Sequence, residues 1–485
     1  MIILNDNPSL ISPDELTGRC ILTYVKGRYR NVYNIISLIM AFNCNFVSIP
    51  VQVDSNVLRW TRQEDRQTYR NSFSKDRDRI LYSKSFLRLR GKTQVFMLQK
   101  NDYIRTRMTH TLEVNQLAKT IASALGQNID LVEAIALGHD IGHTPFGHIG
   151  ERTIDGLIAC DMKVPQDAKG FKHNLQALRL LCDLEKGADY PEIHGLNLTK
   201  YTLWGVSHHS SVKEKTDNNG NVIIPIETSY PFYDSYLNQI DSYWSFEGYI
   251  VAIADEIAQR HHDIEDSLRF GIVDRKTLLN EIKKFEPVFS KSEKECLKRL
   301  NRDIGIMEDT VFHSLFARLV INLYVTNVIT HTKNQFRELE TKYGVNKQID
   351  FIKIRPSMSR EDYSNCVSFS SELKPLDESF QDFLKTNVLH SFQAQAMDGK
   401  ARYIIKKLFS AFTEDPTQLP DSTLCSYAVL QELDDNRRET ALQNITSNEC
   451  LLHRCIADYI GGMTDQFAYD EFDRLYQYFG KNLPY

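Results

Sequence analysis

Apolar residues recur every three to four positions along most of the chain, which is the spacing of one face of an α-helix. Between residues 108 and 125, for example, Val114, Leu117 and Ala118 share one stripe, and Gly126 stands where a helix would end. Few segments alternate with the period of two that marks a strand, and the pattern contains no internal repeat. From about residue 60 onward we therefore predict a mainly α fold.

The predicted helix ends draw attention to one pair of polar residues. Asp130 is a candidate N-cap for a helix over Leu131–Ile141, and Gly142 follows the end of that helix. His139 and Asp140 would then lie at the helix C-terminus, whose partial negative charge favours a nearby cation.

Three further local patterns complete the secondary-structure prediction. Thr144 followed by Pro145 is typical of the N-cap and the first position of a helix. A helix over Ile250–Arg260 would carry Asp255 on an otherwise apolar face. The run KEKTDNNGNV, which starts at Lys213, favours turns with positive φ and predicts an exposed hairpin or loop.

Composition narrows the class of protein. The apolar fraction of 42% can fill a large core, and the net charge of -5 argues against a global basic field for nucleic acid. The nine cysteines are odd in number and form no Cys-x-x-Cys, so the sequence indicates neither a disulfide framework nor a cysteine zinc site. We expect a reducing, cytoplasmic location.

The apolar run from Val32 to Val53 loosely resembles a signal peptide or a membrane anchor. Asparagines and Pro50 interrupt it, whereas a spanning helix needs about 20 mostly apolar residues. We therefore expect no membrane segment there.

Candidate chemistry is concentrated in the segment GHDIGHTPFGHIGE, which starts at Gly138. Its fourteen residues contain three histidines and two carboxylates: His139, Asp140, His143, His148 and Glu151. A buried carboxylate is expensive unless it is paired or bound to a metal ion. This density of polar side chains beside two helix ends indicates a functional site rather than a helix surface.

His110 and Asp255 lie on core-facing stripes of other predicted helices, so that with His139 and Asp140 they form a mixed imidazole and carboxylate set. Such a set suits Mn, Mg, Fe or Zn with positions left open for water and substrate. A single histidine on an apolar stripe is more often a hydrogen-bonded core residue. The adjacent His-Asp pair shifts the balance toward a metal site.

The order of a distant His, an adjacent His-Asp and a far Asp resembles the HD superfamily of metal phosphohydrolases, and more closely the deoxyguanosinetriphosphate triphosphohydrolase family within it. A His-Asp dipeptide alone would be weak evidence, but six blocks follow the family order between about residues 60 and 470. The blocks are DRDRILYSKSFLRLRGKTQVF from Asp76, RTRMTHTLEV from Arg105, GHDIGHTPFGHIGE from Gly138, FKHNLQALRLL from Phe171, IVAIADEIAQRHHDIEDSLRFG from Ile250 and DYIGGMTDQFA from Asp458.

The resemblance implies a role for each polar residue of these blocks. The implied metal ligands are His110, His139, Asp140 and Asp255. His148 and Glu151 match the family's catalytic histidine and its acidic partner, and their spacing of three places both on one helix face. The alternative for this pair is an ordinary surface ion pair. His173 matches a second active-site histidine.

The implied reaction is the hydrolysis of dGTP, or of other deoxynucleoside triphosphates, to deoxynucleoside and tripolyphosphate. It would use one divalent metal ion per site, with Mn, Mg or Fe favoured and Zn or Co as alternatives. We expect a metal-held water to attack the α-phosphorus, and His148 to move a proton at the nucleophile or at the departing 5′-oxygen.

Substrate contacts rest on the resemblance alone. It places Gln94 beneath the sugar and base, and Asn174 and Lys400 at the phosphate tail. Two positions depart from the family pattern. Gln259 stands where a tyrosine often lies near the deoxyribose, and His208 with His209 replaces a common Lys-Tyr pair. These departures leave the base preference open.

The domain prediction has four parts. Residues 1–58 form an N-terminal extension, 59–275 an HD-domain catalytic core, 276–380 an accessory region of solvated helices, and 381–485 a C-terminal helical region that packs on the core. The resemblance also implies a homo-oligomer, a tetramer or hexamer, and leaves single-stranded DNA open as a partner. Other functions compatible with the sequence are a nucleotide phosphodiesterase, a monophosphatase or a nucleotide-sensing regulator without hydrolysis.

Overall fold

The computed structural model describes residues 58–61, 69–94, 105–161, 170–186, 194–210, 215–216, 222–223, 233–345, 351, 353–430 and 437–476. Within these ranges the chain is helical apart from one antiparallel pair of short strands, β1 (Lys215–Thr216) and β2 (Val222–Ile223). The mainly α fold class is therefore confirmed, and so is the hairpin expected near residue 213. The turn of that hairpin, the segment 1–57 and its apolar run lie outside the described residues.

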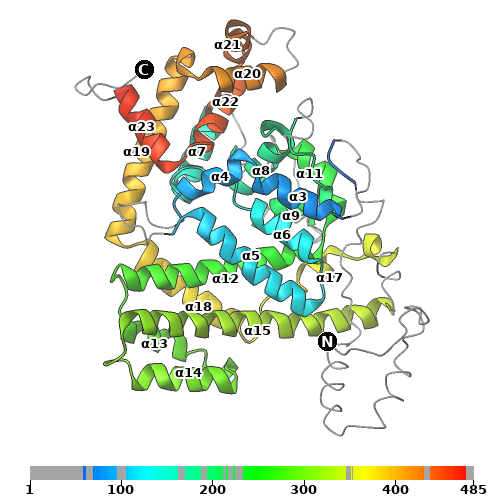
Figure 1. Ribbon diagram of the computed structural model, residues 1–485, viewed down its shortest axis with the longest axis vertical. Helices are drawn as coiled ribbons and strands as arrows, with labels where there is room; N and C mark the ends of the chain where they lie inside the picture. Colours follow the sequence, from blue (N-terminus) through cyan, green and yellow to red (C-terminus); the bar gives the residue numbers. More distant parts are fainter. Residues whose placement is uncertain are drawn as a thin grey trace, which may run out of the picture.

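The helices before residue 270 surround the polar segment that the sequence singled out (Figure 1). They are α3 (Ser72–Leu81), α4 (Lys84–Arg88), α5 (Arg107–Leu125), α6 (Ile129–Gly138), α7 (Gly147–Asp161), α8 (His173–Arg179), α9 (Lys200–His208), α11 (Asp234–Ile240) and α12 (Phe246–Arg269). The helices that follow are α13 (Arg275–Lys283), α14 (Lys291–Arg302), α15 (Asp309–Tyr343), α17 (Arg360–Ser364), α18 (Lys374–Leu384), α19 (Phe392–Glu414), α20 (Asp421–Leu430), α21 (Arg438–Thr446), α22 (Glu449–Gly461) and α23 (Asp465–Tyr476).

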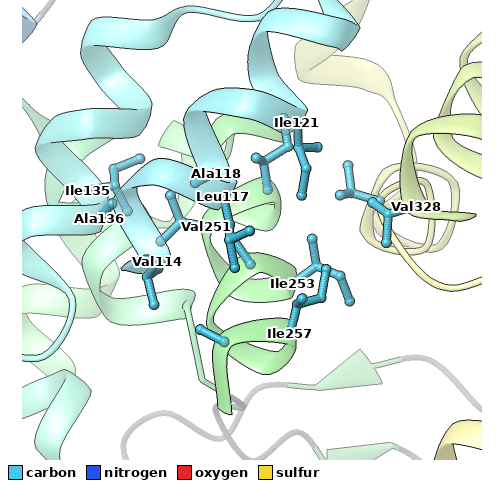
Figure 2. Close-up of a cluster of buried hydrophobic side chains, with 14 of the residues drawn as sticks. Val114, Leu117, Ala118, Ile121, Ile135, Ala136, Val251, Ile253, Ile257 and Val328 are labelled. Carbon is cyan, nitrogen blue, oxygen red and sulfur yellow. The ribbon is translucent and has the colours of Figure 1, made fainter. Parts of the chain in front are cut away.

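Helices α5, α6 and α12 pack against one another at the centre of the molecule (Figure 1). Figure 2 shows the apolar stripe of α5, including Val114, Leu117 and Ala118, facing Ile135 of α6 and Val251 of α12. A Thr-Thr capping box opens α5, and Gly126 closes it in the left-handed conformation, as the sequence predicted. This packing fixes the axes of the helices that carry the site.

Two predicted helix starts were wrong. The side chain of Asn128, not of Asp130, caps α6 by accepting a hydrogen bond from the backbone of Leu131. Helix α7 begins at Gly147 rather than at Pro145, because Phe146 has a φ of 61°. Gly147 also has a φ of 61°, so the right-handed backbone conformation begins only after it.

Residues 276–380 contribute many side chains to the hydrophobic core around the central helices. Buried aromatic residues of this region, Phe312, Phe316, Tyr324 and Phe336, belong to one hydrophobic cluster with the central helices. Only its outer faces fit the expectation of solvated helices. Of the described helices, α15 is the one that is long and apolar enough to cross a membrane by length and composition, a criterion that a packed core helix also meets.

A second hydrophobic cluster lies between α7 and the C-terminal helices α19 to α23, and it includes Phe146, Ile149 and Ile154 (Figure 1). A buried polar network crosses from α8 to α22 next to this cluster. Asp458 accepts hydrogen bonds from Arg179 (2.7 Å), Arg454 (3.0 Å) and Gln176 (2.7 Å), and from the hydroxyl of Tyr427. Burial raises the pKa of Asp458, but the two arginines and the bonded groups hold it at about 2. The carboxylate is therefore ionised.

This network predicts a large effect of a single substitution. Asp458→Ala leaves Arg179 and Arg454 buried without their carboxylate, and removal of one partner of a buried ion pair costs roughly 3–5 kcal/mol of unfolding free energy. Urea unfolding followed by circular dichroism measures the change. The control is Arg302→Ala, which removes an exposed ion pair with Asp303 and should leave the midpoint unchanged. Equal midpoints for the two variants would contradict the prediction.

Candidate metal centre and active site

Three helices bring the four candidate metal ligands together. His110 comes from α5, His139 and Asp140 from the end of α6, and Asp255 from α12. His110 Nε2 lies 2.8 Å from Asp255 Oδ1, and His139 Nε2 lies 3.8 Å from both Asp140 Oδ1 and Asp255 Oδ1. His110 and Asp255, which are 145 positions apart in the sequence (255 − 110), thus lie close together beside His139 and Asp140.

The cluster is buried on one side and open on the other. His110, His139 and Asp140 are buried, whereas the side chain of Asp255 is 24% exposed. Burial alone would raise the pKa of Asp140, but Arg107, His143 and His139 hold it well below its usual range. Arg107 donates from Nη1 to Asp140 Oδ2 over 2.8 Å. Asp140 is therefore a carboxylate, and its second oxygen faces the histidines.

His139 offers a lone pair to this cluster. Its Nδ1 lies 2.7 Å from the carbonyl oxygen of Ala136, which can only accept, so Nδ1 carries the proton. Nε2 is buried with no hydrogen-bond partner among the described residues. An unsatisfied buried polar atom costs roughly 1–3 kcal/mol. A metal ion at this position would remove that cost.

A chain of hydrogen bonds from Glu113 through His262, here called the Glu113 relay, places a proton on His110 Nδ1. Burial raises the pKa of Glu113, but hydrogen bonds from His261 and His262 hold it below the usual range, so its oxygens only accept. His262 Nε2 donates to Glu113 over 2.7 Å, and burial lowers the pKa of His262 to about 3. The free Nδ1 of His262 must then accept the proton of His110 Nδ1, 3.1 Å away.

His110 Nε2 lies 2.8 Å from an oxygen of Asp255, so both atoms are directed at the same position. Either a proton on Nε2 or a metal ion can hold this pair together. The residues therefore fit a divalent metal ion, since neutral imidazole nitrogens and carboxylate oxygens are its usual protein ligands. Histidine ligands whose second nitrogen is hydrogen-bonded are the common arrangement at such sites.

The sequence patterns did not predict a role for Glu113 or for His262. Glu113 lies three residues after His110, on the same face of α5, and His262 lies seven residues after Asp255, two turns along α12. A polar residue at either spacing on an otherwise apolar stripe was the available signal. The sequence alone could not show that the two helices bring these side chains into contact.

Next to this cluster, Glu151 binds two histidines. Its Oε2 accepts from His173 Nδ1 over 2.8 Å and from His148 Nδ1 over 3.4 Å. Burial raises the pKa of Glu151, but the two histidines hold it well below the usual range. The side chain of His148 is 54% exposed, whereas that of His173 is buried. The predicted pair of His148 and Glu151 is present, but Glu151 holds His173 more closely.

His143 lies between the candidate metal ligands and the histidines that Glu151 binds. The sequence patterns predicted no specific role for it. Its Nδ1 lies 2.8 Å from Asp140 Oδ1, and its ring centroid lies 3.8 Å from that of His173. Burial and the charge of Arg107 lower the pKa of His143 well below its usual range. The ring is therefore neutral at physiological pH.

The loop that carries these residues is fastened to the C-terminal helices. The buried Nζ of Lys92 donates to the carbonyl oxygens of His143 and Gly461. Asp465, at the start of α23, accepts from the backbone N–H of Phe146 over 2.9 Å. A Cβ at Gly142 would lie 2.0 Å from the carbonyl oxygen of His173, so only glycine lets the loop lie against α8.

The three residues predicted to bind substrate lie in different surroundings. The amide nitrogen of Asn174 donates to the carbonyl oxygens of Ser207 (2.5 Å) and Ser210 (3.3 Å), so it already has two acceptors. Lys400 is exposed on α19, with Nζ 4.7 Å from the ring centroid of Tyr469. The side-chain oxygen of Gln94 is buried with no hydrogen-bond partner among the described residues. Their roles toward substrate stay predictions.

The three positions that depart from the family pattern also lie in different surroundings. His208 stacks on Trp204, with ring centroids 4.4 Å apart, and burial lowers its pKa to about 4. His209 instead points toward the cluster, where its Nε2 lies 3.2 Å from that of His173. Gln259 lies one turn after Asp255 on α12.

Comparison with known proteins gives two family matches within the chain. Residues 107–259 match the family model of the HD domain, and residues 367–474 match that of the phosphohydrolase-associated domain. All four candidate metal ligands fall within the first match. The fold and the site therefore define a metal-dependent phosphohydrolase of the HD-domain class.

Curated relatives specify the family. A deoxyguanosinetriphosphate triphosphohydrolase-like protein of Geobacter sulfurreducens is 34% identical over 85% of this chain and 91% of its own length. The protein of the same description from Azoarcus sp. is 36% identical over 84% of this chain and 90% of its own length. The chain belongs to this family of deoxyguanosinetriphosphate triphosphohydrolase-like proteins.

The geometry predicts how metal retention depends on Asp140. Asp140→Asn keeps the side-chain volume but removes the charge that a divalent ion requires, so the variant should retain less than a tenth of the wild-type metal after dialysis, a loss of about 1.4 kcal/mol or more. Inductively coupled plasma mass spectrometry measures the metal content. The control, Asp303→Asn, changes the C-cap carboxylate of α14, which pairs with Arg302, and should retain the wild-type amount. Wild-type metal content in Asp140→Asn would rule out Asp140 as a ligand.

Proposed function

We propose that the protein hydrolyses dGTP, and other deoxynucleoside triphosphates, to deoxynucleoside and tripolyphosphate. The observation that carries this proposal is the partly exposed imidazole of His148, which Glu151 orients beside the cluster of His110, His139, Asp140 and Asp255. The names of the curated relatives, which describe triphosphohydrolase-like proteins of deoxyguanosine triphosphate, support the same reaction.

We assign one divalent ion to His110, His139, Asp140 and Asp255. The equal number of nitrogen and oxygen donors favours Mn, Fe or Mg, with Zn or Co as alternatives. When bound, such an ion activates water and neutralises charge on phosphate oxygens. Arg107 keeps Asp140 ionised, and Glu113 orients the ring of His110 through His262, so that Nε2 faces Asp255.

His148 is assigned to proton transfer. Its side chain is the exposed member of the histidine group, so it can reach a phosphate ester that enters from solvent. Glu151 accepts a hydrogen bond from His148 Nδ1, which leaves Nε2 as the nitrogen available to a substrate. An imidazole can give or take a proton near neutral pH, and departure of the 5′-oxygen of a deoxynucleoside requires one. Tripolyphosphate then leaves intact.

Substrate binding, assembly and location are proposed on the family resemblance. Gln94 would contact sugar and base, and Asn174 and Lys400 the triphosphate, whose negative charge needs local donors because the net charge of the chain is -5. A cytoplasmic homo-oligomer, tetramer or hexamer, is proposed on the same ground, and single-stranded DNA is a further candidate partner.

Two other functions compete with this one. A different HD-domain nucleotide phosphohydrolase, a phosphodiesterase or monophosphatase, would use the same metal cluster. A regulator that binds nucleotide without hydrolysis would not need an exposed histidine bonded to an ionised carboxylate, so the pair of His148 and Glu151 argues for hydrolysis.

Product analysis separates these functions. The protein would be incubated with each of the four deoxynucleoside triphosphates, GTP, a deoxynucleoside monophosphate and a cyclic nucleotide, with Mg²⁺, Mn²⁺ and Co²⁺ compared. Mass spectrometry should detect tripolyphosphate and deoxynucleoside in equal amounts. Release of pyrophosphate or of phosphate alone would contradict the proposal, and so would the lack of any product with every substrate.

His148→Ala tests the proton-transfer role. The variant should bind metal and substrate as the wild type does, because His148 is not a member of the metal cluster, but its kcat should fall about 10²- to 10⁴-fold, the usual contribution of general acid–base catalysis. Steady-state kinetics with dGTP measures kcat and KM separately. The control is His390→Ala, at an exposed position after α18. If His148→Ala turned over dGTP at the wild-type rate, the assignment would fail.

A further inference from the structure

Asp465, at the start of α23, joins two segments that carry proposed active-site residues. Its Oδ1 accepts a hydrogen bond from the backbone N–H of Phe146 over 2.9 Å, and Phe146 lies two positions before His148. Its Oδ2 accepts from the backbone N–H of Thr93 over 3.0 Å and from the Thr93 hydroxyl, and the next residue is Gln94. One carboxylate therefore holds the neighbours of the proposed proton-transfer histidine and of the proposed sugar contact.

These hydrogen bonds are shielded from solvent. Asp465 is 2% exposed and Thr93 is 3% exposed, so bulk water does not replace a bond that is lost. Burial raises the pKa of Asp465, whereas the hydrogen bonds from Thr93 and Phe146 act against this rise and favour the charged form. Hydrogen bonds to a charged acceptor are stronger than those between neutral groups. The contact is therefore a firm link between the two segments.

The two segments also lie directly against each other. Gly147 has a φ of 61°, and a Cβ built on it would lie 3.7 Å from the carbonyl oxygens of both Thr93 and Gln94. Thr93 in turn forms an antiparallel bridge with Thr106, which caps the helix that carries His110. A movement of either segment therefore displaces the other.

The turn before α23 packs closely on the same segment. Lys92 Nζ donates to the carbonyl oxygen of Gly461 over 2.9 Å. A Cβ built at Gly91 would lie 2.9 Å from Cγ2 of Thr464, which is closer than the roughly 3.5–4.0 Å of an ordinary carbon contact. The backbone at Gly91 thus lies against the turn, and this packing fixes the distance over which Asp465 acts.

We propose that Asp465 is a positioning residue for the hydrolysis, because it sets the placement of Gln94 relative to His148. This inference rests on the proposed function, in which Gln94 contacts the nucleotide and His148 transfers a proton. A displacement of about 1 Å at a reacting group can lower a rate about 10²-fold. The phosphohydrolase-associated region, which includes Asp465, would thereby control the reaction without supplying a group that reacts.

Steady-state kinetics of the full-length protein with dGTP tests the link to His148. Asp465→Asn keeps the side-chain shape but places an N–H donor opposite another donor, so kcat should fall about 10²-fold. In the His148→Ala background the same substitution should change kcat by less than about threefold, because the group that it positions is absent. Equal losses in the two backgrounds would overturn the proposal, since a defect of folding alone lowers both rates by one factor.

The KM reports on the other segment. Asp465→Asn should raise the KM for dGTP, and this rise should disappear in the Gln94→Ala background. The control is Asp470→Asn, at an exposed carboxylate of α23 that accepts from Gln466 over 2.8 Å, and it should leave kcat and KM unchanged. A rise in KM of the same size with and without Gln94 would also contradict the proposal.

Hydrogen–deuterium exchange tests the coupling without any substrate. Thr93→Val keeps the volume but removes the hydroxyl that binds Asp465, so amides of residues 146–149, to which Thr93 is not bonded, should exchange about fivefold faster. Thr93→Ser keeps the hydroxyl and should restore the slow exchange. Mass spectrometry of proteolytic peptides measures both.

The exchange result is independent of the reaction. Wild-type exchange at residues 146–149 in Thr93→Val would overturn the proposal even if the protein hydrolyses dGTP. Faster exchange there would support the coupling even if no deoxynucleotide were hydrolysed, and in that case the proposed function alone would fail.

Discussion

The site depends on one constraint, the placement of protons on the histidines around Asp140. Carbonyl and carboxylate oxygens take up the Nδ1 proton of His139, His173 and His209, and the relay from Glu113 through His262 does the same for His110. Each ring is thereby held with its Nε2 directed inward. A divalent cation among these nitrogens and the carboxylate of Asp140 would satisfy them together, so the hydrogen bonds outside the cluster orient the groups that would bind it.

The rest of the fold keeps these hydrogen bonds in place. The packing of α5, α6 and α12 sets the spacing of His110, His139 and Asp255 (Figures 1 and 2). The C-terminal helices hold the other half of the site, because α7 packs in their hydrophobic cluster and Asp465 binds the backbone of Phe146. The catalytic histidine and the metal ligands thus belong to two hydrophobic cores, which the loop after Asp140 joins. Regions far apart in sequence are needed for one active site.

Sequence patterns predicted the parts of this arrangement that local periodicity controls. The apolar stripe of α5 and its end at Gly126 follow from helix geometry, and the ordered polar blocks identified the four candidate ligands. The start of α7 could not be predicted, because Phe146, which has a positive φ, donates its backbone N–H to Asp465, and that residue is 319 positions away. The Glu113 relay and the contact of His173 with His209 likewise join separate helices, and no spacing along one helix reveals such a contact.

Anomalous X-ray diffraction at the manganese edge, on crystals soaked with Mn²⁺, tests the central claim most directly, since it locates bound ions without reference to activity. The account predicts the strongest peak among His110, His139, Asp140 and Asp255, where the inward lone pairs meet. A strongest peak at Glu113, His261 and His262, where protons fill the same positions, would contradict the account, and so would a map without a peak at Asp140.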